Sequence, residues 1–225
     1  DIILRQYFYD WDKEQMARLT IENQNAIYPP PPLTEETIRK NLELFCDFLQ
    51  QVPPVFRQSV ETYYQHPVNT MAFDAIDYGF RALTYGKGAY QCGEDEALLV
   101  EVELPKTQYW NIQLASHFWE ARDYHLRQNS LNGHQAQVDS DGVFRAVISH
   151  KDPGIANWLD AGGNQTGLMT IRYYEADSTP IPTVTRVPFS DLAKALPADA
   201  QTVTTEQRQK TLRNRARAMQ RLNRD

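Results

Sequence analysis

The sequence predicts a β-rich (α+β) protein: an antiparallel, jelly-roll-like β-sandwich with a helical insertion near the N-terminus and a helix at the C-terminus. Three observations support this class. From about residue 80 to 187, apolar residues recur at every second position in short runs separated by polar turns. Residues 34–66 and 204–224 repeat their apolar residues with the helical period instead. The chain has 225 residues, 41% of them apolar, which is enough for one large core.

The first 28 residues are predicted to form an N-terminal hairpin. Residues 2–9 are rich in Ile, Tyr and Phe, and residues 17–22 would be the partner strand across a loop at 10–15. The chain begins inside a strand-like run, so we expect it to be a fragment of a longer chain. Pro29 to Pro32 then form a stiff, extended break.

The segment 34–66 is predicted to be a helical insertion. Thr34 is a good N-cap, and two glutamates in the first turn suit the positive end of the helix dipole. Pro53 and Pro54 are expected to end this helix and begin a second one. Cys46, beside the apolar stripe, is predicted to be a small core residue, Cys92 to lie in a turn, and the two to stay unbridged. Helical spacing predicts a buried face made by Ile38, Leu42, Phe45 and Leu49.

The sandwich is predicted over residues 80–187. Its expected strands are 97–104, 108–119, 135–139, 143–149, 168–174 and 183–187, with a hairpin turn at Asp139 to Gly142. A short helix is expected at 190–196. Thr204 and Gln207 have the spacing of a capping box, which predicts the start of a terminal helix over 205–223.

The strand 109–119 carries the most site-like pattern. Amide and imidazole groups cost about 1–3 kcal/mol each when they are buried without partners, so the polar set is expected on a wet, concave face. The loop 151–167 is longer than most connections and is expected to act as a lid. The inward set is Trp110, Ile112, Leu114, Ser116 and Phe118, and the outward set is Tyr109, Asn111, Gln113, Ala115, His117 and Trp119.

Two sets of candidate site residues follow from this pattern. Aromatic rings stack on sugar faces, and amides or carboxylates bind hydroxyl groups. A histidine and a carboxylate two apart on a strand share a face and can transfer a proton. The alternatives are a strand-end histidine, a turn-capping aspartate and core tryptophans. The ligand-binding candidates are Asn111, Gln113, Trp119, Asn157, Trp158 and Arg172. The catalytic candidates are His150, Asp152, His117 and Asp160.

Other classes of function have little support. The chain has no nucleophile elbow, phosphate loop or dinucleotide fingerprint, and its His and Asp residues lack close metal-ligand spacing, so neither a cofactor nor a metal is expected. The net charge is −6, and the last twenty residues carry seven of the 23 Lys and Arg against two acids, so the rest of the chain is more acidic still. An acidic body disfavours nucleic acid, and we expect the basic helix to dock on that body. No apolar run is long enough to span a membrane. Oligomeric state and compartment are left open, the cytoplasm being slightly favoured.

Residues 109–174 resemble the bacterial family of domain of unknown function 1214. The matching stretches include Tyr109 to Leu114, Asp139 to Gly142 and above all His150 to Asp160, and the resemblance extends to the opening residues 5–12 and 31–34. It implies a jelly-roll-like sandwich, similar in outline to those of glycan-active proteins, within a longer parent chain. It brings no established reaction. This chain has Ala161 to Asn164 where the family commonly has Thr-Ala-Gly-His.

The resulting hypothesis is a domain that binds or processes a small polar or glycan-like ligand. The ligand would lie on the face of strand 109–119, under loop 151–167. The alternative is a structural or assembly module without an active site, in which the aromatic block belongs to the core. Whether the candidate residues line one opening or scatter over the fold distinguishes the two.

Overall fold

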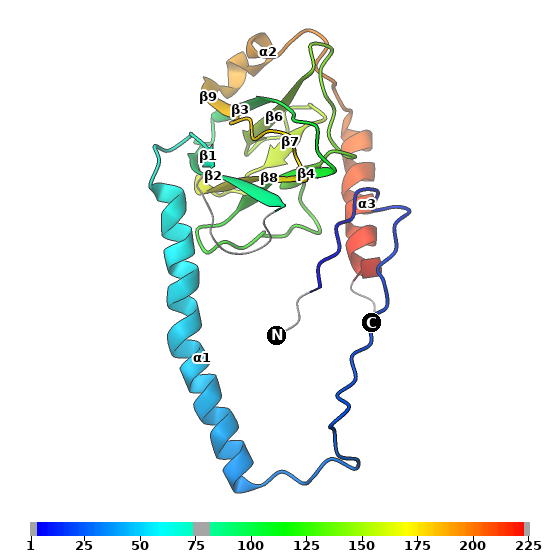
Figure 1. The fold of residues 1–225 in the computed structure, drawn as a ribbon. Helices are drawn as coiled ribbons and strands as arrows, with labels where there is room; N and C mark the ends of the chain where they lie inside the picture. The colour runs from blue at the N-terminus through cyan, green and yellow to red at the C-terminus, as the bar shows by residue number, and fades with distance from the viewer. Residues whose placement is uncertain (1–3, 74–81, 223–225) are drawn as a thin grey trace.

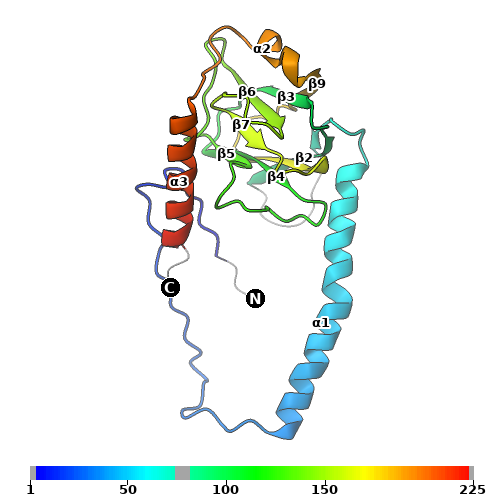
Figure 2. The same ribbon diagram turned by 180° about the vertical axis from the view of Figure 1, so that it is seen from behind.

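The computed structural model describes residues 4–73 and 82–222, and its strands form two open sheets. One sheet has the strand order β1-β2-β8-β4-β5 and the other β7-β6-β3-β9 (Figures 1 and 2). The strands are β1 (Ala72–Phe73), β2 (Leu83–Gln91), β3 (Glu96–Glu103), β4 (Tyr109–Ala115), β5 (Ser130–Asn132), β6 (Val143–Ser149), β7 (Trp158–Asp160), β8 (Thr166–Tyr174) and β9 (Thr183–Pro188).

A single apolar core lies between the two sheets. Side chains alternate across a strand, so each strand sends every second residue into this layer. Leu98 and Phe144 from the four-stranded sheet meet Ile112 and Ile171 from the five-stranded sheet, and all four are fully buried. The protein is therefore β-rich with two sheets facing each other, as the sequence predicts.

The strand pairing departs from the prediction in two places. β7 runs parallel to β6, with Val147 opposite Trp158, in a sheet expected to be wholly antiparallel. The expected strand 135–139 is reduced to one bridge, between Val138 and Phe144. β7 can lie beside β6 because residues 150–157 carry the chain back to the level of Val147 before it runs along the last three residues of that strand.

The helical insertion is one helix, α1 (Glu35–Glu61), followed by the short 3-10 helix η1 (Thr62–Tyr64). The predicted cap is confirmed, because the Thr37 amide donates to Thr34 Oγ1. The predicted break at Pro53 and Pro54 is wrong, and both prolines lie inside the helix. A proline withholds an amide from the carbonyl four residues earlier. Here the helix is exposed, so water can bind those carbonyls.

The predicted burial of the α1 apolar face is also wrong. α1 projects away from the sheets (Figures 1 and 2). Among the described residues, α1 reaches the body only near its C-terminal end, where the Phe56 ring lies 6.1 Å from that of Trp119, and Val60 and Tyr63 pack on Leu168 of β8. Helical periodicity predicts that one face is apolar but not what covers it. Half or more of the surface of most of the predicted core positions is exposed: Ile38 48%, Leu42 58%, Phe45 57% and Leu49 51%.

The predicted N-terminal hairpin is absent from the described residues 4–28, which are extended chain and turns. The aromatic side chains of this segment find partners on the five-stranded sheet instead. Tyr7 stacks on Tyr174 with ring centroids 5.7 Å apart, and Asn132 Nδ2 donates to the carbonyl of Tyr9 at 3.0 Å. These contacts bury the rings without pairing the segment to itself. Residues 1–3 of the hairpin, residues 80–81 of the sandwich and residues 223–224 of the terminal helix lie outside the described residues.

The C-terminal helices agree with the sequence. The predicted short helix is observed as η2 (Phe189–Asp191) and α2 (Leu192–Ala195), and Leu192 packs on the outer side of the four-stranded sheet. The terminal helix is α3 (Thr205–Leu222). Its capping box is formed in both directions, with Gln207 N bonded to Thr204 Oγ1 at 3.2 Å and Thr204 N to Gln207 Oε1 at 2.7 Å. Within the described chain, no helix combines the length and the apolar content needed to cross a bilayer.

The two cysteines exchange their predicted environments, and this can be tested. Both are free, Cys46 is exposed on α1, and Cys92 is fully buried. Burial raises the pKa of the Cys92 thiol to about 11, and Glu96 adds to the effect. A raised pKa keeps this thiol protonated and unreactive at neutral pH. We expect a thiol reagent at pH 8 to modify one site per folded chain, and Cys46→Ser to abolish that reaction. A second fast-reacting thiol in the folded protein would contradict the assignment.

Candidate functional site

The outward residues of β4 form a half-buried polar face on the five-stranded sheet. Burial alternates along β4, with Trp110, Ile112 and Leu114 inside and the odd positions partly exposed. The predicted parity is therefore confirmed for 109–115. Asn111 and Gln113 point to the same side as Arg172 of β8, whose Cα lies opposite that of Asn111.

Arg172 is the charged centre of this surface, which we call the Arg172 face. The face comprises Tyr85 and Lys87 of β2, Tyr109, Asn111 and Gln113 of β4, and Thr170 and Arg172 of β8. Arg172 Nη1 donates to Gln113 Oε1 at 3.1 Å and lies 3.5 Å from Asn111 Oδ1. Its guanidinium carbon is 5.5 Å from the centroid of the Tyr85 ring. Among the described residues, no carboxylate forms an ion pair with Arg172.

Tyrosines surround the cation on this face. Tyr7 packs against Tyr109 at 5.2 Å between ring centroids, and Tyr63 Oη lies 2.8 Å from Thr170 Oγ1. Burial raises the pKa of Tyr109 to about 12, an effect that the nearby Arg172 reduces. Tyr109 is therefore a neutral hydrogen-bonding group at physiological pH. The combined chemistry is that of two half-buried cations, Arg172 and Lys87, among aromatic rings and amides, which suits a polar ligand with an acidic group.

His117 and Trp119 lie at the end of the face but not in its strand. β4 ends at Ala115, and residues 116–119 form a turn in which Trp119 has a φ of 63°. This turn overturns the predicted strand to residue 119 and leaves Phe118 78% exposed. His117 Nδ1 lies 3.0 Å from Tyr64 Oη, and the Trp119 ring packs edge-on against Tyr63 at 6.3 Å. Both side chains contact the α1–η1 region, so neither lies beside Asn111.

The predicted proton-transfer pair of His150 and Asp152 does not form. His150 Nε2 lies 2.9 Å from the carbonyl oxygen of Cys92. Asp152 Oδ1 accepts the Gly154 amide at 2.9 Å, the turn-capping role considered above, and the other oxygen accepts from Arg208 Nε at 2.9 Å. The two side chains have separate structural partners, so this pair is not a catalytic base.

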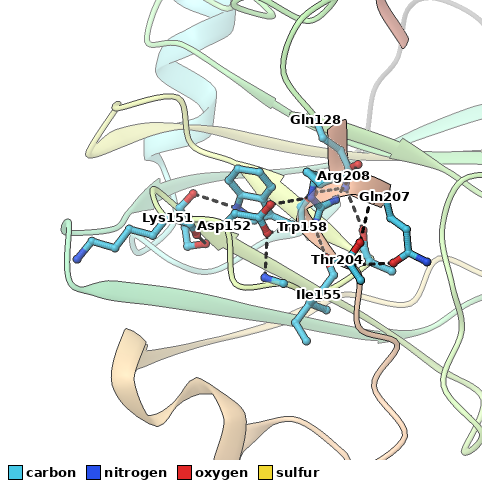
Figure 3. A network of polar contacts seen from close by, with 11 residues as sticks. Gln128, Lys151, Asp152, Ile155, Trp158, Thr204, Gln207 and Arg208 are labelled. Carbon is cyan, nitrogen blue, oxygen red and sulfur yellow. Dashed lines mark hydrogen bonds and ion pairs between the residues drawn. The ribbon is translucent and has the colours of Figure 1, made fainter. Parts of the chain in front are cut away.

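Asp152 belongs to a network that joins α3 to the body (Figure 3). Arg208 is 5% exposed and donates to Asp152, to Gln128 Oε1 at 3.1 Å and to the carbonyl of Ile155. Its guanidinium carbon also lies 5.1 Å from the Trp158 ring. The basic helix thus docks on the body through two buried arginines, of which Arg208 pairs with Asp152 and Arg215 donates to the carbonyls of Tyr124 and Ser130.

The remaining predicted residues lie in the four-stranded sheet. Asn157 Nδ2 donates to the carbonyls of Gln137 and Arg145, and Trp158 Nε1 donates to the carbonyl of Ser149. Asp160 accepts from Arg127 at 2.9 Å and from the Gly162 amide at 2.8 Å. The expected lid over 151–167 instead contains β7, and it does not cover the Arg172 face. Asn157, Trp158 and Asp160 therefore each have a hydrogen-bond partner within the protein, in the sheet that does not contain Arg172.

The cavity beside Asp160 is too small for an organic ligand. Its volume is about 20 Å³, which holds one water molecule. Asn129 Oδ1 is buried there without a hydrogen-bond partner, so a water molecule in the cavity can donate a hydrogen bond to it. Asn164 Oδ1 accepts from Arg122 at 2.8 Å at the rim of this cavity. Within residues 4–73 and 82–222, no three His, Cys, Asp or Glu side chains gather as metal ligands.

A larger groove, of about 480 Å³, runs between α3 and the N-terminal segment, and sequence reasoning missed it. Trp11 and His134 line one side, while Lys210 and Asn214 of α3 line the other. Arg215 lies beside it, 4.8 Å from the Trp11 ring, and bonds to the Tyr124 carbonyl. The alternation of a strand gives no information about this site, because its walls come from both ends of the chain.

Comparisons with known proteins identify the fold but no activity. No family model and no curated protein matches the chain. A solved structure of an uncharacterised protein from Burkholderia cenocepacia is similar, with 28% identity and a TM-score of 0.74 over 81% of this chain and 52% of that one. The VPA0106 protein from Vibrio parahaemolyticus matches over 70% of this chain and 47% of its own, at 15% identity and a TM-score of 0.40. The chain spans about half the length of either protein.

The Arg208 network gives a prediction about stability. Arg208→Ala removes an ion pair, two other hydrogen bonds and the packing on Trp158, while leaving Gln128 Oε1 buried without its donor. Asp152 is 36% exposed, so water partly compensates for its lost partner. We expect a loss of about 2–3 kcal/mol in the free energy of unfolding, measured by urea denaturation.

The matched control for this change is Arg213→Ala, at an exposed position on the same helix. It removes the same side chain and the same charge from α3, and we expect a change within about 0.5 kcal/mol. Equal losses for the two variants would show that Arg208 has no special role in holding α3.

Proposed function

We propose that the Arg172 face binds a small polar ligand, glycan-like in its hydroxyl groups and carrying a carboxylate or a similar acidic group. The observation that supports this most directly is the guanidinium of Arg172, half-buried and oriented by two amide oxygens, with no carboxylate as partner among the described residues. Both amides lie beside Nη1, and among the described residues Arg172 Nε and Nη2 have no hydrogen-bond acceptor, so a planar acid can pair with them.

The neighbouring side chains suit the rest of such a ligand. Tyr85 and Tyr109 offer aromatic surface to the apolar face of a sugar ring, and Asn111 and Gln113 offer amide groups to hydroxyls. The proposal retains the face of β4 from the sequence hypothesis and omits the loop 151–167. Because His150, Asp152 and Asp160 are engaged elsewhere, the proposal is one of binding, and no reaction is assigned.

The finer fold assignment and the family are also proposals. In support of a jelly-roll-like topology, the early strands β2 and β3 pair with the late strands β8 and β9. In support of the family of domain of unknown function 1214, the block 109–174 contains the motifs described above. The alternative role, an assembly module, is favoured by a different observation, the exposed apolar face of α1.

The binding proposal can be tested with an acidic sugar and its neutral counterpart. We expect D-galacturonate to bind more tightly than D-galactose in a calorimetric or NMR titration. Arg172→Gln should weaken galacturonate binding about 10- to 100-fold, the usual effect of a charge-assisted hydrogen bond of about 1.5–3 kcal/mol. Arg172→Lys should retain part of the affinity, since it keeps the charge but loses the planar fork.

Arg186→Gln is the control for this experiment, because Arg186 lies on β9 of the other sheet and is 45% exposed. Arg186→Gln removes one positive charge, as Arg172→Gln does, and should leave galacturonate binding unaltered. The site is wrong if Arg172→Gln binds galacturonate as the unmodified protein does. The ligand class is wrong if the folded protein binds neither sugar at millimolar concentration.

A further inference from the structure

The exposed apolar face of α1 is the largest departure of this molecule from the surface of an ordinary monomer. Monomeric proteins rarely expose a contiguous apolar patch of more than a few hundred Å². Eight large apolar side chains of α1 are about half exposed or more, and they lie along one helix. They are Ile38, Leu42, Leu44, Phe45, Phe48, Leu49, Val55 and Phe56, with exposed fractions from 48% to 61%.

Six positions on this helix have the spacing of a coiled-coil seam. They alternate steps of four and three residues over nineteen residues, and we call them the α1 stripe: Ile38, Leu42, Phe45, Leu49, Val52 and Phe56. Steps of four and three keep side chains on one side of a helix, facing a single partner. At 3.6 residues per turn, Leu44, Phe48 and Val55 lie roughly 80–120° from the centre of the stripe, all on the same side of it. Within the described part of the chain, the stripe contacts the body at Phe56, whose ring lies 6.1 Å from that of Trp119, and α1 packs on the sheet only at Val60.

We propose that the α1 stripe is the contact surface of a homodimer, in which the α1 helices of two copies pair in antiparallel orientation. The stripe is self-complementary under a two-fold axis at residue 47. Antiparallel pairing about that axis sets Ile38 against Phe56 of the second copy, Leu42 against Val52 and Phe45 against Leu49. All six positions then have a partner, and in most of the layers a larger side chain meets a smaller one, as close packing requires.

The buried area and the charges agree with this pairing. At roughly 100 Å² of exposed surface for each of the six stripe side chains, two copies together would bury about 1,000–1,200 Å², at the lower end of the range of specific interfaces. Antiparallel helices also place opposite ends of their dipoles side by side. Arg57 of each copy comes level with Thr37 of the other, next to Glu36 in the acidic first turn, which places opposite charges near each other.

α1 is accessible to a second copy because it projects from the body. Figures 1 and 2 show the helix extending beyond both sheets, with its first turn farthest from them. The antiparallel arrangement places the two bodies at opposite ends of the helix pair, so that they do not compete for space. Each copy contributes the same surface, which is the isologous contact typical of two-fold dimers.

The first test is the mass of the protein in solution. We expect sedimentation equilibrium to give twice the 26.0 kDa of one chain at micromolar concentration. Leu49→Glu places a charge in two layers of the dimer and should raise the dissociation constant on the order of 100-fold. Leu49 is 51% exposed in the single chain, so the variant should keep its fold, as circular dichroism can confirm. Gln50→Glu adds the same charge away from the stripe and should leave the dimer intact.

The second test is the orientation of the helices. In a Cys46→Ser background, the double variant Ile38→Cys, Phe56→Cys should form disulfide-linked dimers on mild oxidation, whereas Ile38→Cys alone should not. In a parallel pair, residue 38 of one copy would lie beside residue 38 of the other, so Ile38→Cys alone would form the disulfide-linked dimer. That result would overturn the antiparallel arrangement. Cys92 is fully buried and does not interfere.

A protein of 26.0 kDa at every concentration would overturn the dimer and would assign the stripe to a different protein segment. A dimer that Leu49→Glu leaves unchanged would show that another surface holds the copies together. Sugar binding at the Arg172 face is measured independently, and neither result depends on it.

Discussion

The apolar layer between the two sheets is the constraint on which the rest of the structure depends. Ile112, Ile171, Leu98 and Phe144 are removed from water there, at about 1.5–3 kcal/mol for each buried side chain. Because the side chains of a strand alternate, placing these residues inside forces their neighbours outside. Arg172 lies between two core positions of β8, and Asn111 and Gln113 flank Ile112 on β4. The polar face is thus a direct consequence of the core.

The second sheet uses its polar residues differently. Asn157, Asp160 and Asp152 all lie in a segment whose composition resembles a binding loop, yet each is held by structural partners. Polar groups near a core have to be hydrogen-bonded, and a carbonyl, a turn amide or a buried arginine satisfies them as well as a ligand does. What distinguishes Arg172 from this group is its partners, which are neutral amides rather than an opposite charge.

The apolar stripe of α1 shows that one sequence pattern is compatible with burial in a core and with burial in an interface. A globular core and a coiled-coil partner both require an apolar stripe, and the amino-acid sequence is compatible with either. In this molecule the stripe lies outside the core, and the two prolines near its end lie where water can reach the carbonyls that they leave free. An interface provides the burial that the fold leaves out.

The sequence by itself determined the elements whose signal is local. The alternation of 109–115 and the caps at Thr34 and Thr204 depend on residues that are neighbours in the chain, and the structure has them as predicted. Only the tertiary structure decided which groups meet across long separations. Arg208 and Asp152, which form an ion pair, are 56 positions apart in the sequence. The groove beside α3 is lined by residues from both ends of the chain. α1 is exposed because the helix extends beyond the sheets. Local chemistry fixes which side of an element is apolar or polar, whereas the partner of that side is set by the packing of the whole chain.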